Sequence, residues 1–180
     1  MANLSVFVAG VHGSGKSTLC DEVSRLIGAP FVTASSLIKR AKSMGIEKSV
    51  SNVEYNQAIL ISEFRNLSNA NSRIILDGHF CLLNQDGEIE ELSANVFRQL
   101  SIKQIVLVIA APPVIYERLL ARDGTTHGLE VATIEAFQRA ELKNARNVSN
   151  ELGLPLIEVD SSDGHGAVDA VVDFLTAEDR

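Results

Sequence analysis

The chain has 180 residues, of which 46% are hydrophobic and 22% are charged. This composition is typical of a globular protein and excludes the disordered and fibrous classes, and the length suits one domain. Acidic residues outnumber basic residues by 23 to 16, which gives a net charge of −7. Because the chain has no basic surplus to neutralise a phosphate backbone, we expect no general binding of nucleic acids.

No segment of the sequence predicts insertion into a membrane or export. The longest apolar run, residues 105–111, is far shorter than the ~20 residues that span a bilayer, and the first residues lack a basic leader. Cys20 and Cys81 have the spacing of neither a metal site nor a redox pair. We therefore expect a cytoplasmic protein with two reduced, structural cysteines.

Short apolar runs alternate with helical patterns along the chain. The runs at 6–8, 31–32, 74–76, 105–109 and 156–159 predict strands, and the most hydrophobic of them, 105–109, is expected to be central. Apolar residues at helical spacing predict helices over 16–27, 35–44, 51–67, 114–122, 130–152 and 167–175. This alternation predicts one α/β domain over residues 1–180, a three-layer α/β/α fold with a five-stranded parallel sheet.

The first predicted strand leads into GVHGSGKS, residues 10–17, which fits the P-loop pattern G-x-x-x-x-G-K-[ST]. Glycines let the amide groups of such a loop turn inward around an anion, and the following helix adds its positive end. We expect Lys16 to reach the β- and γ-phosphates of ATP and the Ser17 hydroxyl to bind Mg²⁺. His12 occupies a variable position and is expected to face solvent. The residues expected to bind the nucleotide are Gly10, Gly13, Ser14, Gly15, Lys16, Ser17 and Thr18.

Asp77 ends the third predicted strand, in the segment IILDGHF. The carboxyl ends of neighbouring parallel strands line one crevice, so we expect Asp77 to face the P-loop. There it would hold Mg²⁺ together with Ser17, directly or through a water. The alternative is an aspartate that caps a helix or a turn.

Three classes of P-loop protein are compatible with this loop: GTP switches, large mechanochemical ATPases and small phosphotransferases. A guanine-specific switch needs an Asn-Lys-x-Asp element, which the sequence lacks. The chain is also too short for an unfoldase with its additional helical domain. The small kinases remain.

Four segments resemble the nucleoside monophosphate kinases, and among them the archaeal-type adenylate kinases and their eukaryotic nuclear relatives. They are the loop GVHGSGKST, the D-x-H element Asp77-Gly78-His79, the run YERLLAR at 116–122 and the helix from Ser35. The resemblance covers residues 4–160 approximately and implies an acceptor-binding excursion at about 35–70 and a lid at about 122–128. The family's acidic residue on the acceptor-side helix is replaced here by Ser35-Ser36, and the lid is short. These departures leave the identity of the acceptor open.

Arg118 and Arg122 lie four residues apart and therefore share one helix face. Two guanidinium groups there can close over a triphosphate and stabilise charge on the transferred phosphoryl group. The alternative is a solvated pair that binds Glu117 or Asp123. On the acceptor side, the resemblance implies that Lys39 or Arg40 binds the acceptor phosphate, unless both only decorate a surface helix. His79 would contact the acceptor or a water, or else form a structural hydrogen bond.

The function that the resemblance implies is transfer of the γ-phosphoryl group of ATP to a nucleoside monophosphate, with AMP as the first expectation. The attacking group is then an oxygen of the acceptor phosphate, so no covalent nucleophile is needed. One alternative is a P-loop kinase for another small metabolite. The other is a slow ATPase that binds a protein partner in a nucleotide-gated manner.

Overall fold

The structure, a computed structural model, describes residues 4–43, 53–84, 87–126, 128–163 and 166–177. The middle of the predicted acceptor excursion, 44–52, and His127 of the predicted lid lie outside these ranges. Within them, no helix combines the length and the apolar character that crossing a membrane requires.

Five parallel strands form the main sheet in the order β2–β3–β1–β6–β7. Strand β1 is central, and the prediction that the most hydrophobic strand occupies this place is wrong. That strand, β6, is apolar because both of its faces are covered: Ile105 and Leu107 belong to one core cluster, and Val106 and Val108 to the other. The strands are β1 (Leu4–Ala9), β2 (Phe31–Thr33), β3 (Arg73–Gly78), β6 (Gln104–Ile109) and β7 (Leu156–Asp160).

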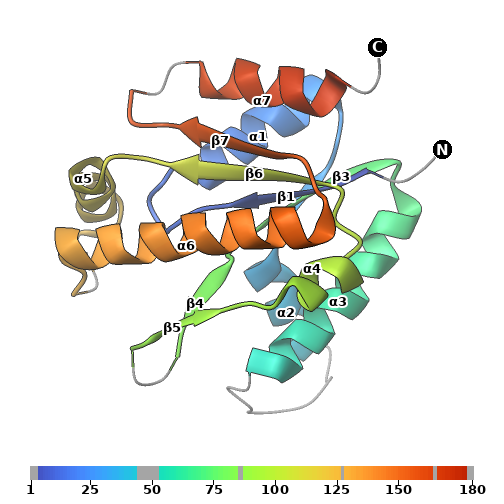
Figure 1. The fold of residues 1–180 in the computed structure, drawn as a ribbon, viewed down its shortest axis with the longest axis horizontal. Helices are drawn as coiled ribbons and strands as arrows, with labels where there is room; N and C mark the ends of the chain where they lie inside the picture. The colour runs from blue at the N-terminus through green and yellow to red at the C-terminus, as the bar shows by residue number, and fades with distance from the viewer. Residues whose placement is uncertain (1–3, 44–52, 85–86, 127, 164–165, 178–180) are drawn as a thin grey trace.

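Helices cover the two faces of this sheet, as Figure 1 shows. One face packs against α1 (Lys16–Ile27) and α7 (Ala167–Thr176). The other packs against α2 (Ala34–Ser43), α3 (Val53–Ala70), α4 (Ala94–Gln99) and α6 (Val131–Leu152). Helix α5 (Pro112–Asp123) follows β6 and packs on the P-loop, with Ile115 and Leu119 in one cluster with Val11. The predicted three-layer fold is confirmed, and the predicted helices agree with α1, α2, α3, α5, α6 and α7 to within a few residues.

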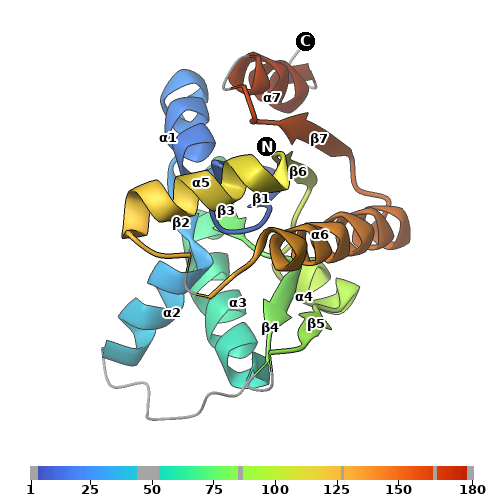
Figure 2. The ribbon, with the colours of Figure 1, turned by 90° about the vertical axis from the view of Figure 1, so that its left-hand side faces the viewer.

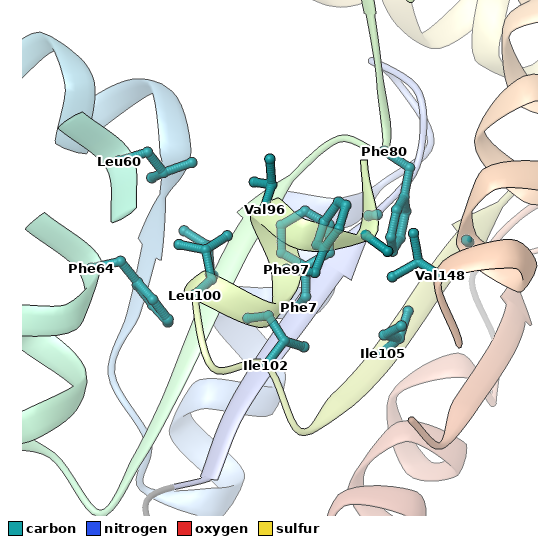
Figure 3. Packing of buried hydrophobic residues seen from close by; sticks show 14 of the residues in the cluster. Phe7, Leu60, Phe64, Phe80, Val96, Phe97, Leu100, Ile102, Ile105 and Val148 are labelled. Atoms are coloured by element: carbon teal, nitrogen blue, oxygen red, sulfur yellow. The ribbon is translucent and has the colours of Figure 1, made fainter. Parts of the chain in front are cut away.

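Aromatic rings pack the centre of the larger core cluster (Figure 3). The ring of Phe7 meets the rings of Phe80 and Phe97 edge-on, with centroids 5.1 Å apart in both pairs. Full burial of a phenylalanine contributes about 1.5–3 kcal/mol relative to an exposed one. Because Phe80 follows Asp77 by only three residues, its burial fixes the segment that leaves the carboxyl end of β3.

The sequence did not predict α4 or the antiparallel hairpin of β4 (Cys81–Leu83) and β5 (Ile89–Glu91). The strands have three residues each and α4 has six, so none is long enough to show a period. The hairpin lies beneath the amino-terminal half of α6 (Figure 1). Lys143 of α6 donates to Glu91 of β5 at 2.8 Å, which ties the helix to the hairpin.

Candidate active site

The P-loop runs so close to β6 and α5 that its glycines cannot carry side chains. Gly10 has φ +145°, and a Cβ there would lie 2.2 Å from the carbonyl oxygen of Val108. A Cβ on Gly13, at φ +83°, would lie 3.0 Å from Leu119. Only glycine adopts such conformations without strain, so the predicted motif matches what the backbone requires. Gly15 then caps the amino terminus of α1, whose positive end points at an anion site.

Lys16 is buried against this loop, with 6% of the residue exposed. Its ammonium donates to the carbonyl oxygen of Val11 at 3.1 Å. Burial lowers the pKa of Lys16, while the carboxylates of Asp77 and Glu141 act in the opposite direction. An ammonium with little water around it interacts strongly with phosphate oxygens, which suits the role predicted for this residue.

Ser17 and Asp77 lie side by side beneath the loop. The Ser17 hydroxyl donates to Oδ2 of Asp77 at 3.2 Å, and Asp77 is 7% exposed. The strand register explains the contact, because Asp77 of β3 pairs with Val8 of β1 just before the P-loop begins. Proteins usually bind Mg²⁺ through one or two carboxylates together with substrate phosphates and waters. A hydroxyl and a carboxylate at this distance therefore fit the ion that the sequence predicts.

A cavity of about 690 Å³, here called the P-loop cavity, opens over the loop. Its volume lies in the range of small-molecule and cofactor sites, about 300–1,000 Å³. The junction of β7 and α7 contributes Ser161, Ala167 and Val168 to its far wall. The predicted site residues that line it are Gly13, Gly15, Lys16, Ser17, Thr18, Arg118 and Arg122.

Arg118 is held over the P-loop by Ser161, which the sequence did not single out. The guanidinium donates to the Ser161 hydroxyl at 3.1 Å and to its carbonyl oxygen at 2.6 Å. The same hydroxyl donates to the carbonyl oxygen of Ser14 at 2.5 Å. A Cβ on Gly15 would lie 3.7 Å from Nη1 of Arg118. This chain of bonds fixes a positive charge beside the amide groups expected to bind phosphate.

Arg122 is paired differently, with its own neighbour in the chain. Its guanidinium makes two hydrogen bonds of 2.7 Å to Asp123, which is one of the alternatives that the sequence left open. This bonding raises the pKa of Arg122. Arg122 shares the P-loop cavity with Arg118, as the four-residue spacing predicts, and its bonds to Asp123 use only Nε and Nη2 of the guanidinium.

Two histidines meet next to the loop. His12 is exposed, as expected. Its ring also contacts the D-x-H element, with its centroid 4.6 Å from that of His79. Partial desolvation of its imidazole, reinforced by the nearby His79, Lys16 and Arg122, lowers the pKa of His12 from 6.5 to about 4. Nδ1 of His79 lies 3.5 Å from Oε1 of Glu141.

Glu141 of α6 is the functional candidate that sequence reasoning missed. It is fully buried and accepts the backbone N–H groups of Phe80 and Cys81 at 3.0 Å. Asn144, one turn later, donates to the carbonyl oxygens of Phe80 and Leu92. The long helix thus holds the segment that follows Asp77. Glu141 could have been found, because it lies on the same helix stripe as Phe137, Ala145 and Val148.

Residues 9–138, more than half of the chain, match the model of the AAA_17 family, described as an AAA domain. The cytidylate kinase of Pyrobaculum arsenaticum is 30% identical over 148 residues, which are 78% of this chain and 71% of that enzyme. The chain belongs to the AAA_17 family of P-loop kinases. It is a kinase of the P-loop type for a nucleotide or another small metabolite, so this part of the prediction is confirmed, while an adenylate kinase-like specificity stays a prediction.

Solved structures show that this P-loop kinase shares its fold with a gluconokinase and a shikimate kinase. A gluconokinase from Sinorhizobium meliloti matches 97% of the chain with a TM-score of 0.56, 18% identity and 90% of its own length covered. The shikimate kinase of Acinetobacter baumannii, solved with shikimate, matches 98% with a TM-score of 0.58, 18% identity and 93% coverage. At such identities these matches describe the fold alone.

The residues predicted to bind the acceptor in this P-loop kinase do not line the P-loop cavity. Lys39 and Arg40 are exposed on α2, and Arg40 donates to Glu63 of α3 at 3.2 Å. Neither residue lines the P-loop cavity, whereas His79 lines a second, smaller cavity together with His12. The roles of Lys39, Arg40 and His79 stay predictions.

The lowered pKa of His12 has a consequence for stability. Between pH 6.5 and 4, the unfolded chain binds a proton at His12 that the folded kinase does not, so folding loses free energy as the pH falls through this window. We expect the free energy of unfolding of His12→Asn to fall less than that of the wild type over this range. Above pH 6.5 the two free energies should change equally with pH. Urea unfolding at pH 7, 6, 5 and 4 measures both slopes. Parallel curves at all four values would contradict the lowered pKa of His12.

Proposed function

We propose that this P-loop kinase transfers the γ-phosphoryl group of Mg·ATP to a nucleoside monophosphate. The observation that carries the proposal is the convergence of Lys16, Ser17 and Arg118 on one cavity of nucleotide size, with Asp77 bonded to Ser17. The choice of acceptor is supported by the segments that resemble nucleoside monophosphate kinases and by the cytidylate kinase relative. AMP is the acceptor that the sequence favours, and CMP is the one that this relative favours.

Phosphoryl transfer depends mainly on the positioning of the reacting groups and on stabilisation of their charge, and it needs little covalent catalysis. An oxygen of the acceptor phosphate attacks the γ-phosphorus, the bond from that phosphorus to the β–γ bridging oxygen breaks, and ADP leaves with its electron pair. Lys16 and Arg118 would stabilise the charge on the transferred group and on the leaving β-phosphate. Ser17 and Asp77 would hold Mg²⁺, which neutralises phosphate charge when it is bound. Arg122, which lines the same cavity, would join this set.

A kinase for a hydroxyl acceptor is the second candidate, favoured by the pair of His79 and Glu141. A hydroxyl must lose its proton when it is phosphorylated, whereas an ionised phosphate oxygen need not. With Nδ1 of His79 facing the buried carboxylate, the other ring nitrogen would be available to accept that proton. This candidate predicts activity with hydroxy acids such as gluconate or shikimate and none with monophosphates.

A panel of acceptors separates these functions. ADP release from Mg·ATP is measured with AMP, CMP, UMP, GMP and their deoxy forms, then with gluconate and shikimate, using Lys16→Met as the blank. We expect a rate that depends on one or two monophosphates and is about 10²–10³-fold lower in the blank. A rate that depends only on a hydroxy acid would establish the second candidate. A slow rate that no acceptor changes would contradict both and favour the nucleotide-gated binding protein.

A further inference from the structure

We propose that a second cavity, between the β4–β5 hairpin and the start of α6, holds the nucleobase of the acceptor; this inference rests on the proposed function. The cavity has a volume of about 230 Å³ and is here called the hairpin cavity. The hairpin and the amino-terminal half of α6, which form most of its lining, lie together on one side of the molecule in Figure 2. Leu82, Leu83 and Ile89 come from the hairpin, and Ile134 and Phe137 come from α6.

The residues that line the hairpin cavity favour an uncharged ligand. Among the described residues that line it there is no Lys, Arg, Asp or Glu. Its polar side chains are His12, His79, Thr133 and Cys81, and burial raises the pKa of the Cys81 thiol to about 12, so this thiol is neutral. Among the described residues, such a site offers no lysine or arginine to balance a phosphate or the carboxylate of a sugar acid. It suits an uncharged, planar ring that stacks on Phe137 and hydrogen-bonds through its edge.

The position of the hairpin cavity fits one part of a nucleotide and not the whole. His12 lines both this cavity and the P-loop cavity, so the two adjoin at that residue. A volume of about 230 Å³ is below the usual range for complete small-molecule ligands, about 300–1,000 Å³. A base in the hairpin cavity would therefore direct its ribose and phosphate past His12 and His79, towards the transferred phosphoryl group.

This location differs from the one that the sequence suggests. The predicted acceptor excursion centres on α2 and α3, with Lys39 and Arg40 as the phosphate ligands. The hairpin cavity contains no described residue of either helix. The two locations can be separated, because each predicts contacts with different elements of the chain.

Filling the cavity tests the inference. Ala136 lines the hairpin cavity from an exposed position on α6, so Ala136→Phe fills the space without disturbing the core. We expect the KM for the accepted monophosphate to rise about tenfold or more, as loss of a base-stacking contact would cause, with the KM for ATP unchanged. Ala132→Phe is the matched control, because Ala132 is exposed one turn earlier on α6 and does not line the cavity. Equal KM values in both variants and the wild type would overturn the inference.

A titration that needs no catalysis separates this inference from the proposed function. AMP or CMP is added to the ¹⁵N-labelled wild-type chain, and we expect the largest amide shifts at Leu83, Ile89 and Phe137. Shifts confined to α2 and α3 in an active kinase would overturn the inference and leave the function standing. Hairpin-cavity shifts in a protein that phosphorylates no monophosphate would uphold the base site and overturn the function. An absence of shifts together with an absence of activity would overturn both.

Discussion

Replacement of Lys16 by methionine is expected to lower phosphoryl transfer by about 10²–10³-fold, the usual effect of removing one donor that faces developing charge. Methionine keeps the unbranched stem that fills the buried position but removes the ammonium that bonds to Val11. Because the loss concerns charge in the transition state, the KM for ATP should rise less than kcat falls. Steady-state kinetics with a saturating acceptor measure both constants.

The fold should not suffer from this change. Burial disfavours the charged form of Lys16, as its lowered pKa indicates, so an apolar side chain of similar shape is tolerated there. The Tm of Lys16→Met should therefore equal or exceed that of the wild type. Near-normal activity in a folded Lys16→Met protein would show that this lysine does not act on the phosphates.

Replacement of Glu141 by alanine is expected to lower the free energy of unfolding by about 3 kcal/mol or more. The change leaves the buried N–H groups of Phe80 and Cys81 without their acceptor, and each such group costs about 1–3 kcal/mol. It also releases the segment that carries His79, so activity should fall further than stability alone explains. Urea unfolding measures the first effect, and kcat at low temperature, where the variant is folded, measures the second.

Glu135→Ala on the same helix is the matched control for Glu141→Ala. Glu135 pairs with Arg139 one turn later in an exposed ion pair. Exposed pairs contribute about 0–1 kcal/mol, so this variant should stay close to the wild type in stability and in kcat. If Glu141→Ala were as stable as Glu135→Ala, the buried carboxylate would not be what holds the segment after β3.

The fold was predictable where apolar residues follow the regular spacing of a strand or a helix. Apolar runs and helical spacing identified the five strands of the main sheet and six of the helices, because both faces of the sheet are buried. The order of the strands could not be predicted in this way, because the hydrophobicity of β6 reflects burial of both its faces and not a central position. The sequence pattern does not predict the β4–β5 hairpin either, because β5 has only three residues and all of them are exposed.

The site was predictable as far as the P-loop motif and the strand-end rule extend. They predict Lys16, Ser17 and Asp77 as site residues, and the contact of Ser17 with Asp77 follows from the strand register. The bonds of Arg118 to Ser161 and of Glu141 to the segment after β3 join residues more than 40 positions apart. Glu141 lies on the apolar stripe of α6, which marks it as buried, but its partners are backbone groups of another element, and no local pattern predicts them.

Direct detection of the product shows whether the γ-phosphoryl group of ATP reaches a nucleoside monophosphate. [γ-³²P]ATP and Mg²⁺ are incubated with the kinase and either AMP or CMP, and the nucleotides are separated by chromatography. We predict label in the corresponding nucleoside diphosphate with the wild type and with Ala132→Phe, and label formed about 10²–10³-fold more slowly with Lys16→Met. Label that appears only in inorganic phosphate, whichever monophosphate is present, would contradict the account.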